Sequence, residues 1–177
     1  EAPREVSTTE EVDGIFASAS FGFKEYLFLD LTARRDVSST LPAGSNDYYY
    51  PSASLGFVFS KLMPDATWLS HGKFRVNYAE VGTSAPPLYV KNYYDVPTGI
   101  DGVPLASVDG RKYNPNLKPE RTKSFETGLE MAFLNNRVGF DLTYYKQNTI
   151  DQIVPLPVSR STGYDFKVIN AGNIQNQ

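Results

Sequence analysis

The chain of 177 residues contains no cysteine, one histidine and no apolar run close to the roughly 20 residues that a membrane-spanning helix requires. Without cysteine it cannot form disulfides or thiolate metal sites. A net charge of −3 with no basic run leaves it without the electrostatic footprint of a nucleic-acid-binding protein. If a membrane is involved, strands rather than helices must cross it.

Catalytic and cofactor-binding motifs are missing as well. No serine lies in a nucleophile elbow and no glycine-rich loop precedes a helix, so we predict no catalytic residue, no cofactor and no metal. His71, beside Gly72, is predicted to be a solvated turn residue rather than a base or a ligand. Glu126 and Glu130 would share one strand face about 13 Å apart, which exceeds either glycosidase spacing. An enzyme is therefore the least favoured class.

What the chain has in abundance is aromatic residues, at 14%, and an apolar–polar alternation of period two. This period is typical of strands with two unlike faces. It predicts six strands, over residues 15–23, 27–34, 52–60, 73–79, 124–133 and 138–145. In the second of them, Leu27, Leu29 and Leu31 alternate with more polar residues. Helix signals are weak, with one short candidate in "PDATWLS" after Pro64.

The connections between these segments alternate strictly between short and long. Lys24-Glu25 and Asn135-Asn136 are predicted to be tight hairpin turns, and the link over 61–72 is of intermediate length. The long connections cover 37–48, 83–120 and a stretch that opens near Pro155. The connection 83–120 exceeds usual loop lengths, which marks it as functional or disordered. We therefore expect short turns at one end of the sheet and elaborated loops at the other.

These features favour an all-β, antiparallel up-and-down meander from an outer-membrane barrel. Strands of about ten residues, tilted near 40°, span the apolar band of about 25 Å, and such barrels have short turns on one side and long loops on the other. Six strands cannot close, and the tail "VINAGNIQNQ" is interpreted as the approach to a seventh. The alternative from another class is a soluble β-sandwich module that binds glycan through aromatic loops.

The barrel interpretation assigns positions to particular side chains. Aromatic girdles are predicted at both rims, with Phe21, Phe23, Tyr26, Phe59, Trp68 and Phe133 at the short-turn rim and Tyr48, Tyr49, Tyr50, Tyr78, Tyr144 and Tyr145 toward the other. Charges predicted to face the lumen are Asp30, Arg34, Lys73, Arg75, Glu126, Glu130 and Asp141. They could pair across strands, hold a plug or contact ligand.

The long connection offers candidate ligand-binding residues. Tyr89, Tyr93 and Tyr94 could stack on sugar rings or pack the loop, and packing is the favoured interpretation. Asp101 and Asp109 each precede a glycine, which predicts two turns rather than a calcium site.

The stretch "NPNLKPERTKSFETGLE", residues 114–130, resembles the loop-to-strand signature of TonB-dependent outer-membrane transporters. "GIFASASFGFKEYLFLDLTARRDVSSTLP", "YYPSASLGFVFS" and "YYKQNTIDQIVPLPVS" are similar to the SusC/RagA group, the glycan and peptide importers of Bacteroidetes-type bacteria. The resemblance implies a bacterial outer-membrane location and a segment, 1–177, of a barrel of about 22 strands. It implies that 83–120 is an extracellular loop.

The same resemblance implies active import of oligosaccharide or peptide by the parent protein, with a SusD-like surface lipoprotein and TonB as partners. The family's plug domain and its TonB-contacting box are not in this sequence. The chain starts at Glu1 and shows no signal peptide, so we expect a parent chain that continues on both sides.

Overall fold

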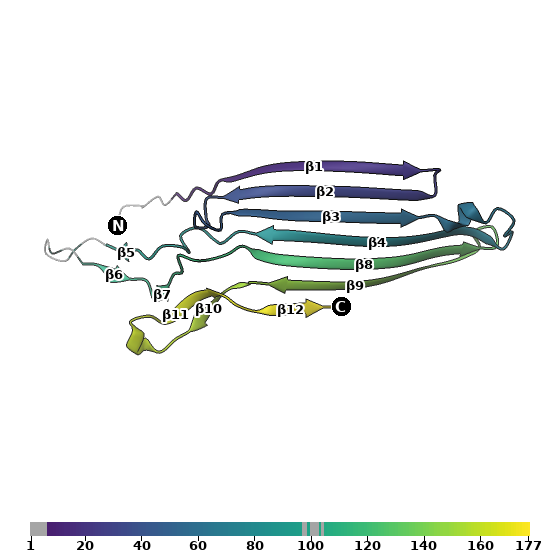
Figure 1. Cartoon of the computed structure of the whole chain (residues 1–177). Coiled ribbons are helices and arrows are strands. Elements are labelled where there is room, and N and C mark those ends of the chain that lie inside the picture. Colours follow the sequence, from purple (N-terminus) through teal and green to yellow (C-terminus); the bar gives the residue numbers. More distant parts are fainter. Residues whose placement is uncertain (1–6, 97–98, 100–102, 104) are drawn as a thin grey trace.

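The computed structural model describes residues 7–96, 99, 103 and 105–177, and its main element is one antiparallel sheet of seven strands (Figure 1). The strands are β1 (Val12–Phe23), β2 (Leu27–Ser38), β3 (Asp47–Phe57), β4 (Leu69–Thr83), β8 (Glu120–Phe133), β9 (Val138–Ile150) and β12 (Asn173–Asn176), and they follow one another across the sheet in this order. Among the described residues, no helix is long and apolar enough to cross a bilayer.

Small elements occupy the ends of this sheet. A two-stranded ribbon of β5 (Tyr94–Asp95) and β6 (Ser107–Val108) lies at the same end as a three-stranded sheet of β7 (Arg111–Lys112), β10 (Ile153–Pro157) and β11 (Phe166–Asn170) (Figure 1). The 3-10 turn η2 (Arg160–Thr162) joins β10 to β11, whereas η1 (Phe59–Leu62) lies at the opposite end, between β3 and β4. Long and short connections are thus segregated.

The six predicted strands are confirmed, and β12 confirms the seventh. Two local predictions are wrong. The strand predicted for 52–60 ends at Phe57, and η1 begins at Phe59 after the single residue Val58. The helix expected after Pro64 is a series of turns, because the 3-10 turn has formed earlier and β4 begins at Leu69.

His71 is also placed differently from its prediction. It lies within β4, directly across from Ala132 of β8, instead of in a turn. Leu69, buried to 8% exposure, starts the strand four residues earlier than the alternation suggested, and a β-bulge between Leu69 and His71 adjusts the register. The His71 Nε2 atom lies 4.0 Å from a carboxylate oxygen of Glu130.

Both predicted hairpin turns are present and both use left-handed backbone. Lys24 and Glu25 have φ of 46° and 58°, and Leu134, Asn135 and Asn136 have φ of 53°, 56° and 62°. Positive φ at successive residues gives a hairpin turn a twist that matches its flanking strands. The Cβ atoms of the lysine and glutamate cost free energy in this region, whereas glycine has no Cβ and the short asparagine side chain offsets the cost by hydrogen-bonding locally.

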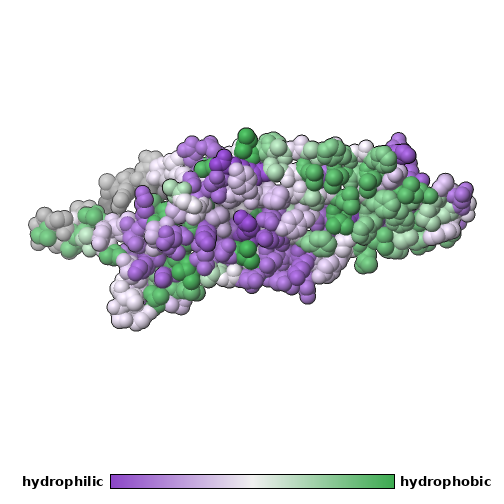
Figure 2. Space-filling model, viewed as in Figure 1, coloured by the Kyte–Doolittle hydropathy of each residue, from purple (hydrophilic) through white to green (hydrophobic). Residues whose placement is uncertain are grey.

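The strand register places the apolar alternation on one face of the whole sheet. Leu29 lies across from Leu55, Leu55 from Val76, and Val76 from Thr127. Paired residues share a face, so the apolar positions form continuous rows across neighbouring strands. Figure 2 shows apolar residues gathered over the short-turn half of the molecule and polar residues over the half nearer the loops.

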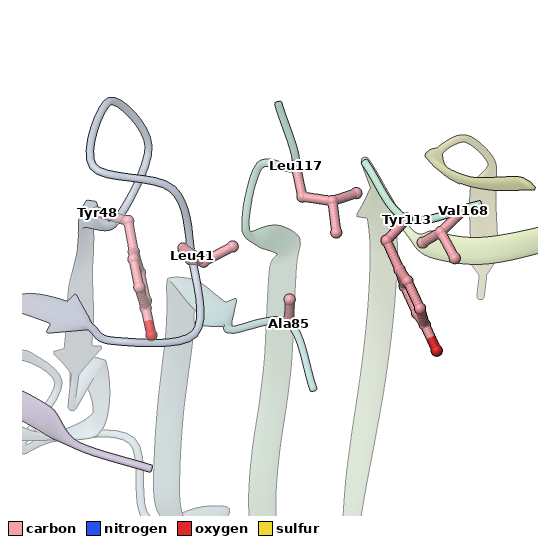
Figure 3. Packing of buried hydrophobic residues seen from close by; sticks show 6 residues of the cluster. All are labelled: Leu41, Tyr48, Ala85, Tyr113, Leu117 and Val168. Carbon is pink, nitrogen blue, oxygen red and sulfur yellow. The ribbon is translucent and has the colours of Figure 1, made fainter. Parts of the chain in front are cut away.

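The sheet is a single layer. Every residue of β1 is exposed, on both faces of the sheet. A β-sandwich would instead cover one face of each strand with a second sheet. The buried hydrophobic cluster lies beyond the strand ends, where loops pack on one another (Figure 3), and consists of Leu41, Tyr48, Ala85, Tyr113, Leu117 and Val168.

Candidate functional site

The polar face of the sheet carries an ordered charge network centred on Arg75 of β4. Its guanidinium donates two hydrogen bonds to the Asp141 carboxylate, at 3.0 and 3.1 Å, and a third to the Thr143 hydroxyl at 2.6 Å. Its Nε lies 3.8 Å from a carboxylate oxygen of Glu126. These contacts reach from β4 over β8 to β9, so one side chain links three strands.

A glycine makes this reach possible. Gly128 of β8 lies directly across from both Arg75 and Thr143. A Cβ built on Gly128 would lie 2.5 Å from the Arg75 Nε, which is closer than two such atoms can approach. The guanidinium therefore lies flat over the bare backbone of β8, and its donors reach the next strand.

Hydroxyl and amide groups extend the network toward β2. Ser54 donates to the Asn77 side-chain oxygen at 2.7 Å, and the Asn77 amide donates to Glu126 at 3.4 Å. Thr32 and Ser52 share a hydrogen bond of 2.6 Å between their hydroxyls. The result is a band of paired polar groups across five adjacent strands, β2, β3, β4, β8 and β9.

The remaining predicted charges lie on the same face outside this band. Lys73 lies across from Glu130, and Asp30 lies between Ser20 and Ser54 of the neighbouring strands. Arg34 is nearer the loops, where its Nε donates to Asp36 at 2.8 Å. Asp36 is buried and also accepts a hydrogen bond from the Tyr50 hydroxyl. All seven predicted charges thus share one face of the sheet.

The aromatic residues at the short-turn rim pack edge to face and face to face. Phe23 meets Tyr26 with ring centroids 5.6 Å apart, and Trp68 stacks on Phe133 at 5.9 Å. Phe21, Phe23 and Trp68 are each at least half exposed. Such amphipathic and aromatic side chains at a strand end are typical of a membrane interface.

At the other rim the predicted girdle is wrong for three of six tyrosines. Tyr48 and Tyr50 share the polar face with Arg34 and Asp36, and Tyr145 lies across from Glu126 on that same face. Tyr48 is buried in the loop cluster and stacks on Tyr50 at 5.9 Å. Consecutive tyrosines alternate between faces in a strand, so a run of three cannot all face outward.

The loop tyrosines are divided between packing and exposure. Tyr93 stacks on Tyr113 at 5.7 Å and Tyr89 contacts it at 5.4 Å, and the hydroxyls of Tyr93 and Tyr113 donate to the Asp109 carboxylate. Tyr94 is 71% exposed. The hydrogen bond from Tyr113 lowers the pKa of Asp109, and burial together with this carboxylate raises the pKa of Tyr113.

The two predicted Asp-Gly turns have different outcomes. Asp109 accepts the backbone N–H of Arg111 at 3.2 Å, which is a local side-chain turn, and its other oxygen is occupied by tyrosine hydroxyls. Asp101 lies outside the described residues. Within the part that is described, no group of three His, Cys, Asp or Glu side chains is arranged to hold a metal ion.

The stretch 114–130 fastens the loop cluster to the sheet. Leu117 is fully buried, and Asn170 of β11 bonds both the N–H and the carbonyl of Lys118 at 2.8 Å. Glu120, the first residue of β8, accepts the N–H of Ile153 at 2.7 Å. Sequence reasoning missed Leu117 and Asn170. The signal that could have identified Leu117 is that it is an isolated apolar residue among Asn, Pro and Lys.

The described residues thus form a sheet with one face of paired polar groups and one apolar face. The family model described as "TonB dependent receptor-like, beta-barrel" matches residues 3–177. The TonB-dependent receptor P26 of Formosa agariphila is 27% identical over 172 residues, which cover 94% of this chain and 17% of that protein. The TonB-dependent receptor SusC of Bacteroides thetaiotaomicron is 28% identical over 163 residues, covering 85% and 16%.

A solved structure of the RagAB peptide transporter superimposes with a TM-score of 0.84 at 21% identity, over 94% of this chain and 19% of that one. At this low sequence identity, the superposition shows only that the two chains share a fold. The chain spans only 17% and 16% of the lengths of the two curated relatives, so the seven-stranded sheet corresponds to one portion of a much larger wall.

Proposed function

The chain belongs to the TonB-dependent receptor β-barrel family, and we propose that it forms part of the wall of an importer that carries oligosaccharides or peptides across the bacterial outer membrane. The family consists of receptors and transporters rather than enzymes, and its SusC- and RagA-like members are outer-membrane proteins. In this proposal the segment acts by passage of substrate along its polar face.

The observation that supports the proposal is the separation of charged from apolar side chains across a single-layer sheet. One face of β4, β8 and β9 holds Arg75 in contact with both Glu126 and Asp141, and the other holds Phe74, Leu129 and Leu142. Charges exposed to hydrocarbon cost several kcal/mol each, whereas charges in a water-filled lumen remain hydrated. The charged face would therefore line the import path.

The same family assignment supports a proposal about the parent protein's partners. We propose that the loop end, including the connection 83–120, is extracellular and contacts a SusD-like surface lipoprotein, and that TonB acts from the periplasmic side on parts of the parent outside this chain. Tyr94, at 71% exposure, is available for substrate at the loop end, whereas Tyr89 and Tyr93 pack on Tyr113, with Tyr93 still 42% exposed.

Uptake measurements test the import proposal. Cells with and without the full-length gene would be supplied with labelled oligosaccharides and labelled oligopeptides, with an uncoupler as the energy control. We expect energy-dependent uptake of one class to disappear with the gene. Unchanged uptake of both classes would contradict the proposal.

Water access tests the assignment of the lumen face. This segment contains no cysteine, so single cysteines can be introduced into the full-length receptor after removal of any others. Asp30→Cys should react with a membrane-impermeant maleimide, and Leu31→Cys, the next residue on the opposite face, should be protected by lipid. Equal labelling at both positions would count against a lipid-facing row.

A further inference from the structure

The apolar face of the sheet ends, toward the loops, in a cluster of basic side chains. Lys146 of β9 lies across from Phe125 of β8, which lies across from Tyr78 of β4. Two residues farther along the same outward rows, Lys123 lies across from Glu80, and Arg121 follows two residues later. Cations thus begin where the aromatic residues end, on the face opposite to Arg75.

Lys123 is the neighbour of both other cations, with Arg121 two residues away on β8 and Lys146 on β9. Lys123 and Lys146 occupy diagonal positions on neighbouring strands, a separation of about 7–8 Å between Cα atoms. Lys146 is exposed, and the side chains of Lys123 and Arg121 are 41% and 43% exposed. Over this stretch β8 is flanked by β4 and β9, and β12 pairs with β9 from Gln147 to Ile150, next to Lys146.

Intramolecular pairing leaves the cluster with excess positive charge. Glu80, with a side chain only 12% exposed, lies 3.8 Å from the Lys123 ammonium and 3.7 Å from the Arg121 guanidinium. Tyr78 donates to the same carboxylate at 2.5 Å. One carboxylate against Arg121, Lys123 and Lys146 leaves a charge of +2 on a chain whose net charge is −3.

The surface is hollowed beside Arg121. A cavity of about 350 Å³ is lined by Lys118 and Arg121 together with Asp47, Tyr48 and Asp151. Asp47 is already bonded to Arg35 by two hydrogen bonds, of 2.9 and 2.6 Å. Lys118 and Asp151 add one charge of each sign, so the excess of +2 is unchanged when the cavity is included.

We propose that this collar, defined as Arg121, Lys123 and Lys146, binds the phosphate of a membrane lipid headgroup. An anionic headgroup at this height would meet the cations, while its acyl chains continue down the apolar rows past Phe125 and Leu142. The apolar face below contains no charged residue on β4, β8 or β9 between the collar and the short turns. Lipid binding at the collar does not depend on which substrate the parent protein transports.

Native mass spectrometry of the full-length receptor in an uncharged detergent tests the collar. The probe is dimyristoyl phosphatidic acid, with dimyristoylglycerol as the phosphate-free lipid and inorganic phosphate as the lipid-free anion. We expect phosphatidic acid to bind selectively and inorganic phosphate not to displace it at equal concentration. The double substitution Lys123→Gln/Lys146→Gln should weaken binding by about fivefold for each charge removed.

Matched variants separate a binding role from a structural one. Lys73→Gln removes a lysine from the opposite face of β4 and should leave lipid affinity unchanged. Glu80→Gln removes the carboxylate that pairs with Arg121 and Lys123 and should raise the affinity, and Lys123→Arg/Lys146→Arg should preserve it. The proposal is overturned if the glutamine pair binds phosphatidic acid as tightly as the unaltered receptor, if dimyristoylglycerol binds equally well, or if Lys73→Gln causes the same loss.

Discussion

Lysine at Ala19 should destabilise the assembled barrel far more than lysine at the next residue, Ser20. The two positions are neighbours near the middle of β1, both are exposed, and both have small side chains. Ala19 lies across from Leu31 in the apolar row, and Ser20 lies across from Asp30 on the polar face. Both variants introduce lysine into the same strand at nearly the same depth. The difference in stability between them therefore reports which face of the sheet the lysine occupies.

The expected loss of stability follows from the depth of Ala19 in the membrane. Ala19 lies four residues from Phe23, where β1 ends, or about 13 Å along the strand. A tilt near 40° reduces this to about 10 Å of height, close to the midplane of an apolar band about 25 Å tall. Lysine at such a depth costs about 2–4 kcal/mol. Lysine at Ser20 faces the Asp30 carboxylate, and an exposed pair of this kind contributes about 0–1 kcal/mol of stabilisation.

Urea unfolding of the full-length receptor in lipid vesicles measures the difference. The unaltered protein and the two single variants would be compared by their unfolding midpoints and slopes, with heat-modifiable gel mobility as the check on assembly. We expect Ala19→Lys to lose about 2–4 kcal/mol and Ser20→Lys to remain within about 1 kcal/mol of the unaltered protein. An equal loss for both, or a larger loss at Ser20, would falsify the face assignment.

Four further predictions concern single contacts. Leu117→Ala should weaken the loop cluster by about 2–5 kcal/mol, seen as faster proteolysis of residues 105–119 with the strands intact. Gly128→Ala should cost about 1–3 kcal/mol in the urea assay, because the new methyl displaces the guanidinium that lies over it. Lys24→Asn/Glu25→Gly should raise the unfolding free energy by about 1 kcal/mol by relieving left-handed backbone. Asp109 has a lowered pKa in the folded loop, so its contribution is present above about pH 4 and is lost as the pH falls through the lowered value. The protection of the amides of residues 105–113, corrected for the intrinsic pH dependence of hydrogen exchange, should therefore fall at low pH, and Asp109→Asn should remove most of that loss.

Much of the sheet was predictable because alternation is a local property. The rows through Leu29, Leu55 and Val76 were predicted from period two alone, and the register places them on one face. The tight turns were also predictable, from their shortness between two alternating segments. Strand ends were less so, since His71 and Leu69 continue β4 through a bulge that interrupts the alternation.

The candidate site was predictable in its composition but not in its partners. The seven charges were identified by parity, whereas the contact of Arg75 with Asp141 spans 66 positions of sequence and crosses an intervening strand at Gly128. Tyr48 and Tyr50 were assigned to the membrane rim although the same parity rule places them with Arg34. For these two tyrosines their aromatic character was given more weight than the alternation of side chains, and the assignment to the membrane rim was wrong.

The sequence by itself determined that the chain forms strands with one apolar and one polar face, because successive side chains of a strand point to opposite faces whatever its neighbours are. Only the tertiary structure decided which polar groups meet. Contacts between residues distant in the chain depend on strand order and register, and these place Arg75 over a glycine, bury Leu117 beneath the loops and gather three cations where the apolar face ends.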